Sequence, residues 1–117
     1  MTTEREELEL AALAAGLLPI PDNKALDYSV DGGLAFCGGG EYTVWSPRHD
    51  DGDSFRLMVK LGMDVFSGNN KVTAWAFGSN GGFTRSFLGV EDKAAATREA
   101  IYQVAVEVGR RMKEQMK

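Results

Sequence analysis

The side chains best suited to chemistry in this chain lie together in the stretch Trp45–Leu61. It contains His49, the only histidine, followed closely by Asp50, Asp51 and Asp53. Imidazole and carboxylate groups of this kind can bind a divalent metal or transfer protons. Their spacing fits neither a calcium loop, which needs acids at alternate positions and a distant glutamate, nor a zinc site with paired histidines and cysteines. We therefore predict no catalytic residue, no metal ligand and no cofactor here.

The same aspartates have a structural use at the beginning of a helix. An aspartate at the N-cap accepts a backbone N–H and contributes about 1 kcal/mol, and a second acid in the first turn gains from the helix dipole. Pro47 has no N–H to donate to a sheet, so a strand should end before it and the chain should turn. We predict a short helix after this turn, ended by Gly62. Its core-facing residues are expected to be Leu57, Met58 and Leu61, with Phe55 and Val59 on the flank.

Two basic residues share the remaining side of this helix. Arg56 and Lys60 lie four residues apart, a mildly repulsive spacing unless an anion is near, and Asp53 is placed to be that anion. Local charge neutralisation on a solvated edge is one interpretation. The alternative is a small enzyme or ligand-binding domain, in which the turn from His49 to Asp53 and the two basic residues surround a pocket.

Length and composition favour one folded domain, 1–117. The 117 residues include 13 basic and 17 acidic ones, which gives a net charge of −4, and no basic stripe is present. Binding to nucleic-acid phosphates relies on clustered lysines and arginines, so nucleic acid is not an expected partner. A single cysteine, Cys37, excludes a disulfide within the chain and favours a reducing compartment. The sequence shows neither a signal-peptide pattern nor a membrane-spanning apolar run, so we expect a cytoplasmic protein without membrane contact.

The elements around the central stretch are predicted from periodicity and turn residues. Thr3 and Glu6 form a capping box for a helix over about 4–15. The pair Asp31-Gly32 predicts a hairpin turn between two strands, and a third strand ends near Trp45. Three more strands follow Gly62, and a long helix begins after Asp92. The apolar stripe of that last helix is expected to be Ala94, Ala95, Ile101, Val104, Ala105, Val108 and Met112.

This order of elements, α-β-β-β-α-β-β-β-α, predicts an α+β fold. Short turns favour antiparallel neighbours, and amphipathic helices must bury their apolar faces. We expect an antiparallel sheet of five or six strands with helices mainly on one face. Trp45 and Trp75 both lie on predicted strands, where tryptophan is usually part of the core, although an exposed one would mark a contact surface.

Residues 45–61 and the last helix resemble a group of short proteins encoded by tailed phages and prophages. The shared features are a Trp-x-Pro, a run of Asp and Gly, a short Arg-Leu-x-x-Lys-Leu helix and a terminal Ala-Ile…Glu-x-Gly-Arg helix. They are carried here by Trp45, Pro47, Asp51, Gly52, Asp53, Arg56, Leu57, Lys60, Leu61, Ile101, Glu107, Gly109 and Arg110. The resemblance implies a phage or prophage origin and no particular activity.

Three functions are compatible with these observations. The preferred hypothesis is a phage-encoded accessory protein, not an enzyme, that binds a host or phage protein in the host cytoplasm; inhibition of a bacterial defence complex is one version. The expected interaction residues are Trp45, His49, Asp51, Asp53, Arg56, Lys60 and Trp75. The second hypothesis is the ligand- or metal-binding domain built on His49–Lys60. The third is a self-assembling structural component, for example a homodimer.

Overall fold

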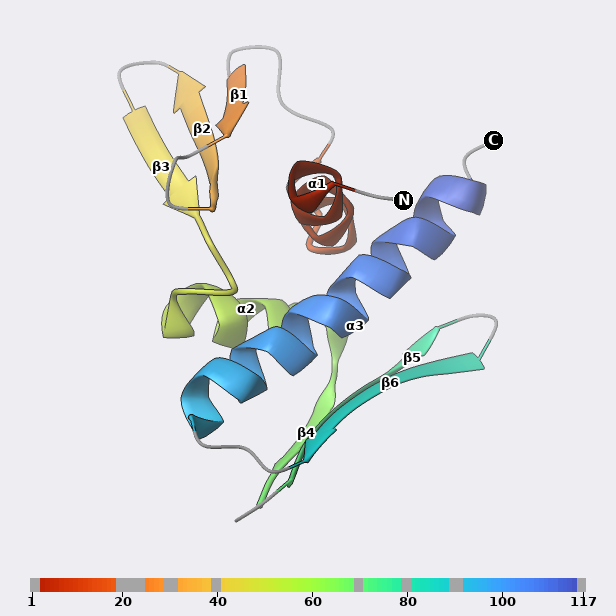
Figure 1. The fold of residues 1–117 in the computed structure, drawn as a ribbon. Helices are drawn as coiled ribbons and strands as arrows, with labels where there is room; N and C mark the ends of the chain where they lie inside the picture. Colours follow the sequence, from red (N-terminus) through yellow and green to blue (C-terminus); the bar gives the residue numbers. More distant parts are fainter. Residues whose placement is uncertain are drawn as a thin grey trace.

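The computed structural model describes residues 3–18, 25–28, 32–38, 41–68, 71–78, 81–88 and 92–115. The fold is α+β, with three helices and two small antiparallel sheets (Figure 1). The elements are α1 (Glu4–Ala14), β1 (Ala25–Tyr28), β2 (Leu34–Gly38), β3 (Glu41–Trp45), α2 (Asp51–Leu61), β4 (Asp64–Ser67), β5 (Lys71–Gly78), β6 (Gly81–Leu88) and α3 (Lys93–Gln115).

The expectation of one sheet of five or six strands is not confirmed. Strands β1, β2 and β3 form one antiparallel sheet, sheet A, and strands β4, β5 and β6 form another, sheet B. The chain leaves β3 through a turn at Pro47 and then forms α2, so β4 begins away from the edge of β3 (Figure 1). A helix between two runs of strands thus separates them into two sheets. The predicted hairpin between β1 and β2 is antiparallel, while Asp31 in its turn lies outside the described residues.

Helix α3 is the central element of the molecule. It packs on sheet B with one side and against α1 and α2 with others, so it runs between two layers (Figure 1). Its buried residues are therefore spread around the helix: Ala100, Ile101, Tyr102, Val104, Ala105, Val106 and Gly109. The single predicted stripe missed Ala100, Tyr102, Val106 and Gly109, and it wrongly included Ala94 and Met112, which are exposed.

The two tryptophans have different environments. Trp45, at the end of β3, is 8% exposed and belongs to the core, together with Leu34 of β2. Trp75 lies on β5, the central strand of sheet B, and is half-buried. The residues on either side of it, Ala74 and Ala76, are buried, so Trp75 lies on the opposite face of the sheet.

Local signals determine the beginning of the first two helices. The hydroxyl of Thr3 accepts the N–H of Glu6 at 3.1 Å, as the predicted capping box requires. The side chain of Asp50 caps α2 by accepting the N–H of Asp53 at 2.7 Å. Gly62 ends α2 with a φ of 61°, a left-handed conformation that favours glycine.

Helix α2 exposes more apolar surface than the sequence suggested. Leu57 is 2% exposed and packs in the core, as predicted. Phe55 and Val59, however, are 60% and 59% exposed. This helix packs mainly on α3, with one side only, so its flank is left uncovered by the described residues.

Helices α1 and α3 approach each other closely. A Cβ added at Gly109 of α3 would collide with the backbone carbonyl of Leu10 in α1. The α1 residues Leu8, Ala11 and Ala12 are completely buried, and two of them are small. Small residues on both helices therefore permit this contact. None of the helices in the described ranges is long and apolar enough to cross a membrane.

Candidate functional site

The turn between β3 and α2 is held by its own aspartate. A carboxylate oxygen of Asp53 accepts the backbone N–H of Ser46 at 2.9 Å. The carbonyl of Ser46 in turn accepts the N–H groups of His49 and Asp50, at 3.1 and 2.8 Å. These bonds fix the backbone at Arg48, so its side chain leaves the turn in a defined direction.

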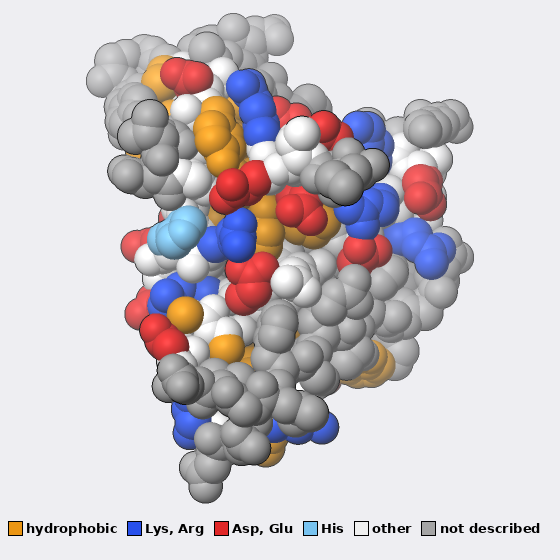
Figure 2. Space-filling model, in the orientation of Figure 1, with side chains coloured by type: hydrophobic (Ala, Val, Ile, Leu, Met, Phe, Trp, Pro, Cys, Tyr) orange, Lys and Arg blue, Asp and Glu red, His pale blue; other side chains and the backbone are white. Residues whose placement is uncertain are grey.

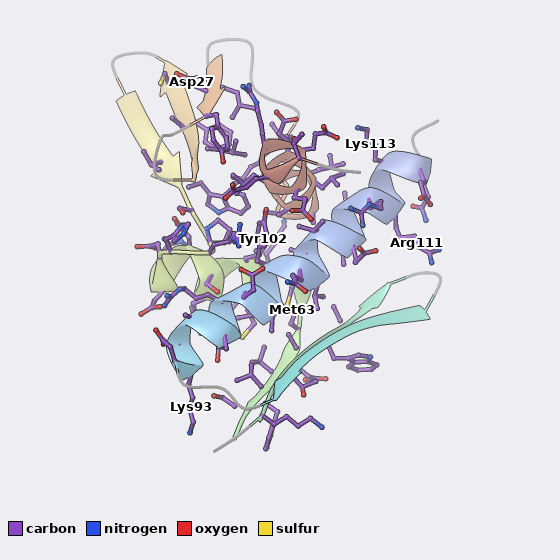
Figure 3. The ribbon with its side chains drawn as sticks, in the orientation of Figure 1. Asp27, Met63, Lys93, Tyr102, Arg111 and Lys113 are labelled. Atoms are coloured by element: carbon purple, nitrogen blue, oxygen red, sulfur yellow. The ribbon has the colours of Figure 1, made fainter. Side chains whose placement is uncertain are left out.

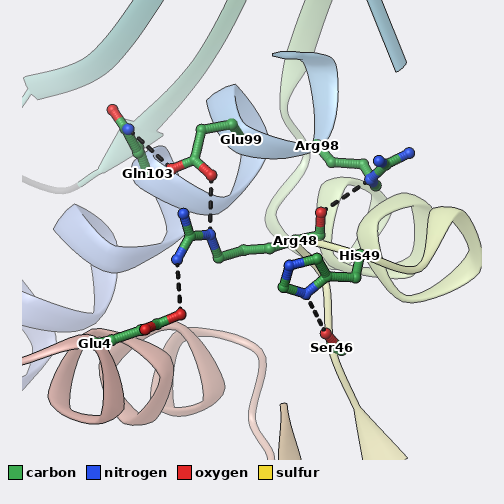
Figure 4. A network of polar contacts seen from close by, with 7 residues as sticks. All are labelled: Glu4, Ser46, Arg48, His49, Arg98, Glu99 and Gln103. Atoms are coloured by element: carbon green, nitrogen blue, oxygen red, sulfur yellow. Dashed lines mark hydrogen bonds and ion pairs between the residues drawn. The ribbon is translucent and has the colours of Figure 1, made fainter. Parts of the chain in front are cut away.

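Arg48 joins the turn to two helices (Figure 4). Its Nε donates to Glu99 of α3 at 2.9 Å, and its Nη1 donates to Glu4 of α1 at 3.1 Å. The guanidinium carbon lies 5.1 Å from the centroid of the Tyr102 ring, within the range of a cation–π contact. Burial lowers the pKa of Arg48, but the charge and hydrogen bond of Glu99, together with Tyr102 and Glu4, more than offset this effect, so the pKa is raised overall.

Arg98 of α3 holds the same turn from the other side. Its Nε donates to the carbonyl oxygen of Arg48 at 2.9 Å (Figure 4). Its Nη1 donates to Asp51 at 2.6 Å. Two arginines and three carboxylates thus connect α1, the turn, α2 and α3. Their role in this network is to position the backbone.

A small polar hollow, here called the acidic pocket, lies beside this network. It has a volume of about 120 Å³ and is lined by Glu7, Arg48, Glu99, Tyr102, Gln103, Val106 and Glu107. Acidic side chains gather around basic ones over α1 and α3 on this face (Figure 2). Gln103 donates through Nε2 to Glu99 at 3.0 Å, which orients the amide (Figure 4).

Tyr102 lines the acidic pocket and carries a buried hydroxyl. The residue is 2% exposed, and its hydroxyl has no hydrogen-bond partner in the part of the chain that the structure describes. It lies among the side chains between α3 and the layer of α1 and sheet A (Figure 3). Burial, reinforced by the negative charge of Glu7, raises the pKa of Tyr102 well above its usual range. The phenol is therefore neutral at physiological pH.

A second hollow, here called the apolar groove, lies between α2, the end of β4 and the beginning of α3. Its volume is about 400 Å³, and it is lined by Asp51, Ser54, Phe55, Met58, Ser67, Lys93, Ala94, Thr97, Arg98 and Ile101. Ser54 is 3% exposed, and its hydroxyl also finds no partner among the described residues. Lys93 extends from the beginning of α3 at the rim (Figure 3).

The residues expected to form an interaction site do not converge. The imidazole of His49 is hydrogen-bonded to the Ser46 hydroxyl at 3.0 Å, and its side chain is exposed. Asp51 pairs with Arg98, whereas Asp53 pairs with Arg56 at 2.8 Å, the neutralising contact that its spacing predicted. The remaining three residues lie in different parts of the molecule. Lys60 is exposed near the end of α2, Trp45 is buried at the end of β3 in sheet A, and Trp75 is on β5 in sheet B.

The residues that do converge were absent from the sequence prediction. Arg48 and Glu99 are 51 residues apart in the chain, and Arg48 and Glu4 are 44 apart. Tyr102 was hidden within the polar part of a predicted amphipathic helix. The one usable signal was Arg48 itself, a basic residue immediately after the proline of the turn.

The aspartates of the turn do not form a metal centre with His49. Nowhere among the described residues do three or more histidine, cysteine, aspartate or glutamate side chains form a group that could hold a metal ion. Asp50 caps α2, and the other two aspartates bind arginines.

Comparisons with known proteins identify no related protein. A scan against protein-family models, a search of curated proteins and a search of solved structures each find no match to this chain. Function must therefore be inferred from the two hollows and the surfaces around them.

Proposed function

We propose that this chain is a non-catalytic protein-binding domain, and that its partner docks on the apolar groove. The observation that carries the proposal is the uncovered apolar flank of α2 beside that groove. Phe55 and Val59 are each about three-fifths exposed and lie one helical turn apart, so they form a continuous edge. Large apolar side chains exposed next to a concave surface are typical of protein interaction sites.

The groove is suited to receive a bulky apolar side chain of a partner protein. Met58 and Ile101 provide apolar walls, and Ser54, whose buried hydroxyl has no partner among the described residues, also lines the groove. Burying a residue of the size of Leu or Phe contributes about 1.5–3 kcal/mol. A groove of about 400 Å³ can hold one such anchor, with Lys93 and Arg98 at its rim.

Polar side chains near the groove favour binding over catalysis. The Ser46 hydroxyl and His49 imidazole are hydrogen-bonded, but neither residue lines the groove or the acidic pocket. Within the described ranges no carboxylate bonds the second ring nitrogen of His49, as a nucleophile–base pair would require. The arginines and aspartates of the turn bind one another and the backbone.

The class of partner follows from the resemblance of residues 45–61 and the last helix to tailed-phage and prophage proteins. A protein of the bacterial host or of the phage, met in the host cytoplasm, is the proposed partner. Inhibition of a bacterial defence complex is one form that such binding could take.

The test is capture from host lysate with matched variants. Phe55→Gln should reduce the partner that the native protein recovers by at least tenfold, because it removes an anchor of roughly 1.5–3 kcal/mol. Phe66→Gln is the control, since Phe66 on β4 has the same 60% exposure but does not line the groove. Equal loss with both variants, or equal recovery with Phe55→Gln, would refute docking at the groove.

A further inference from the structure

We propose that the acidic pocket binds a primary ammonium group. This site is separate from the apolar groove and goes beyond the proposed function. Its occupant is a small alkylamine or the side chain of a lysine, which share this chemistry. The inference rests on three features of the pocket: its charge, the kinds of hydrogen-bonding group that line it, and its size.

Carboxylates outnumber guanidinium groups around the pocket. Glu7, Glu99 and Glu107 line it, and Glu4 lies on the far side of Arg48. Arg48 is bound to Glu4 and Glu99, and Arg110 is bound to Glu107. Among the described residues, three carboxylates and one guanidinium line the pocket. Glu7 pairs with no described cation, so a negative charge is left for a ligand.

The buried hydroxyl of Tyr102 is an independent sign of a missing partner. Leaving a buried hydroxyl unpaired destabilises the folded state, so such groups are rare in native proteins. Tyr102 is one of the residues that line the pocket, and a phenol oxygen carries lone pairs that can accept a hydrogen bond. A cation that donates to it would also be stabilised by the charge of Glu7, the carboxylate that acts most strongly on Tyr102.

The remaining groups of the pocket are mainly acceptors. Because Gln103 donates through its nitrogen to Glu99, its amide oxygen is left to accept. The acceptors are therefore the Glu7 carboxylate, the Tyr102 hydroxyl and the Gln103 amide oxygen. An ammonium group carries three donors that can turn toward separate acceptors, whereas a guanidinium presents a rigid planar fork that suits one carboxylate.

Size limits the ligand to an ammonium group on a slender stem. A volume of about 120 Å³ equals roughly four water molecules at about 30 Å³ each. That space accommodates the end of a lysine side chain or a short alkylamine and excludes an aromatic amine with further substituents. Val106 provides an apolar wall for the methylene groups next to the nitrogen.

The first experiment is a titration of the full chain with n-propylammonium, followed through the NMR signals of the Val106 methyls and the Tyr102 ring. We expect saturable shifts that weaken with added salt. Propan-1-ol lacks the positive charge, and tetramethylammonium has the charge but no N–H to donate. Neither compound should produce these shifts. Absence of saturable shifts up to about 100 mM amine, or equal shifts with tetramethylammonium, would show that the pocket holds only water and would overturn the proposal.

Variants separate the pocket from the general acidity of the chain. Glu7→Gln and Tyr102→Phe should each weaken binding roughly tenfold, because each removes an acceptor for a charged donor. Glu9→Gln is the matched control, since it removes the same charge from the same helix at an exposed residue that pairs with Arg5. Equal weakening by Glu9→Gln would reduce the effect to net charge and would also overturn the proposal.

The source of the ammonium is distinguished by a second ligand. Nα-acetyl-lysine amide should bind as well as n-propylammonium if the natural ligand is a lysine side chain, and clearly more weakly if it is a free amine. Phe55→Gln should leave both titrations unchanged. Failure of amine binding therefore leaves docking at the apolar groove untouched, and the reverse also holds.

Discussion

The acidic pocket and the apolar groove border the same helix and share one defect, a buried hydroxyl without a described partner, yet their surroundings are opposite. Tyr102 is enclosed by carboxylates and a guanidinium, whereas Ser54 lies among Met58, Phe55 and Ile101. The lining of the acidic pocket thus suits a charged ligand, and the lining of the groove suits an apolar one. Helix α3 forms one wall of both hollows, so the element packed opposite α3 determines the chemistry of each hollow.

The two hollows also differ in how firmly their walls are joined. On the side of α1, backbone approaches backbone where Gly109 meets Leu10. On the side of α2, contact with the core depends on Leu57 and leaves Phe55 exposed. We therefore expect the acidic pocket to be rigid and the groove to be adaptable, and substitutions can test this contrast.

The largest expected effect is at the contact of α1 with α3. Gly109→Ala places a methyl group against the carbonyl of Leu10, and backbone atoms cannot rotate away as a side chain can. We expect a loss of about 3 kcal/mol in the free energy of unfolding, at the upper end for overpacking, measured by urea denaturation. Gly62→Ala is the matched control: its Cβ meets no atom within 4 Å, so only the left-handed φ of 61° opposes it, at a cost of about 1 kcal/mol. Similar losses for both would show that α1 and α3 are not closely joined.

A smaller loss is expected on the side of α2. Leu57→Ala removes a side chain that is 2% exposed and leaves a cavity near the groove. Because the adaptable groove can partly collapse, the loss should be about 2–3 kcal/mol, in the lower part of the range for buried leucine. Val59→Ala, at 59% exposure on the same helix, should change the unfolding free energy by less than about 0.5 kcal/mol. A loss with Leu57→Ala larger than that with Gly109→Ala would reverse the proposed contrast.

Alkaline pH should weaken the acidic pocket and leave the groove unaffected. The pKa of Tyr102 is raised in the folded state by burial and by Glu7, while Arg48 opposes this. The phenol of the unfolded chain loses its proton near pH 10, but the folded phenol keeps it, so stability is complete below about pH 10 and falls above it. The extra slope is up to about 1.4 kcal/mol per pH unit. Urea denaturation at pH 9 to 11 should show this extra loss of unfolding free energy in the native chain and not in Tyr102→Phe. The same dependence on pH in both proteins would contradict a buried, protonated phenol.

The parts of the fold that sequence predicted are those with local causes. The Thr3 cap, an aspartate cap on α2 and the Gly62 end each depend on residues within one turn, and all appear in the structure, where Asp50 is the aspartate that caps α2. The division into two sheets could not be read this way, because strand patterns specify which face is apolar and not which strands share a sheet. Likewise, Arg48 meets Glu99 across 51 residues of sequence, and its charge alone names no partner.

The smallest expected effects come from the two hydroxyls, and they compare the hollows most directly. Ser54→Ala removes an unpaired buried hydroxyl and introduces a better helix former, so the unfolding free energy should rise by about 1 kcal/mol. Tyr102→Phe removes the equivalent group from the acidic pocket, but the ring of Phe still faces the Arg48 guanidinium at the position where Tyr102 lies. Its gain should be similar at neutral pH in the absence of amine. A ligand that binds only the folded state adds to its stability. Saturating amine should therefore stabilise the native chain and Ser54→Ala by the same amount, and Tyr102→Phe by less. Thermal denaturation of all three proteins with and without n-propylammonium measures this stabilisation. Equal stabilisation of Tyr102→Phe and Ser54→Ala by the amine would mean that the two hollows do not differ in the way their linings indicate.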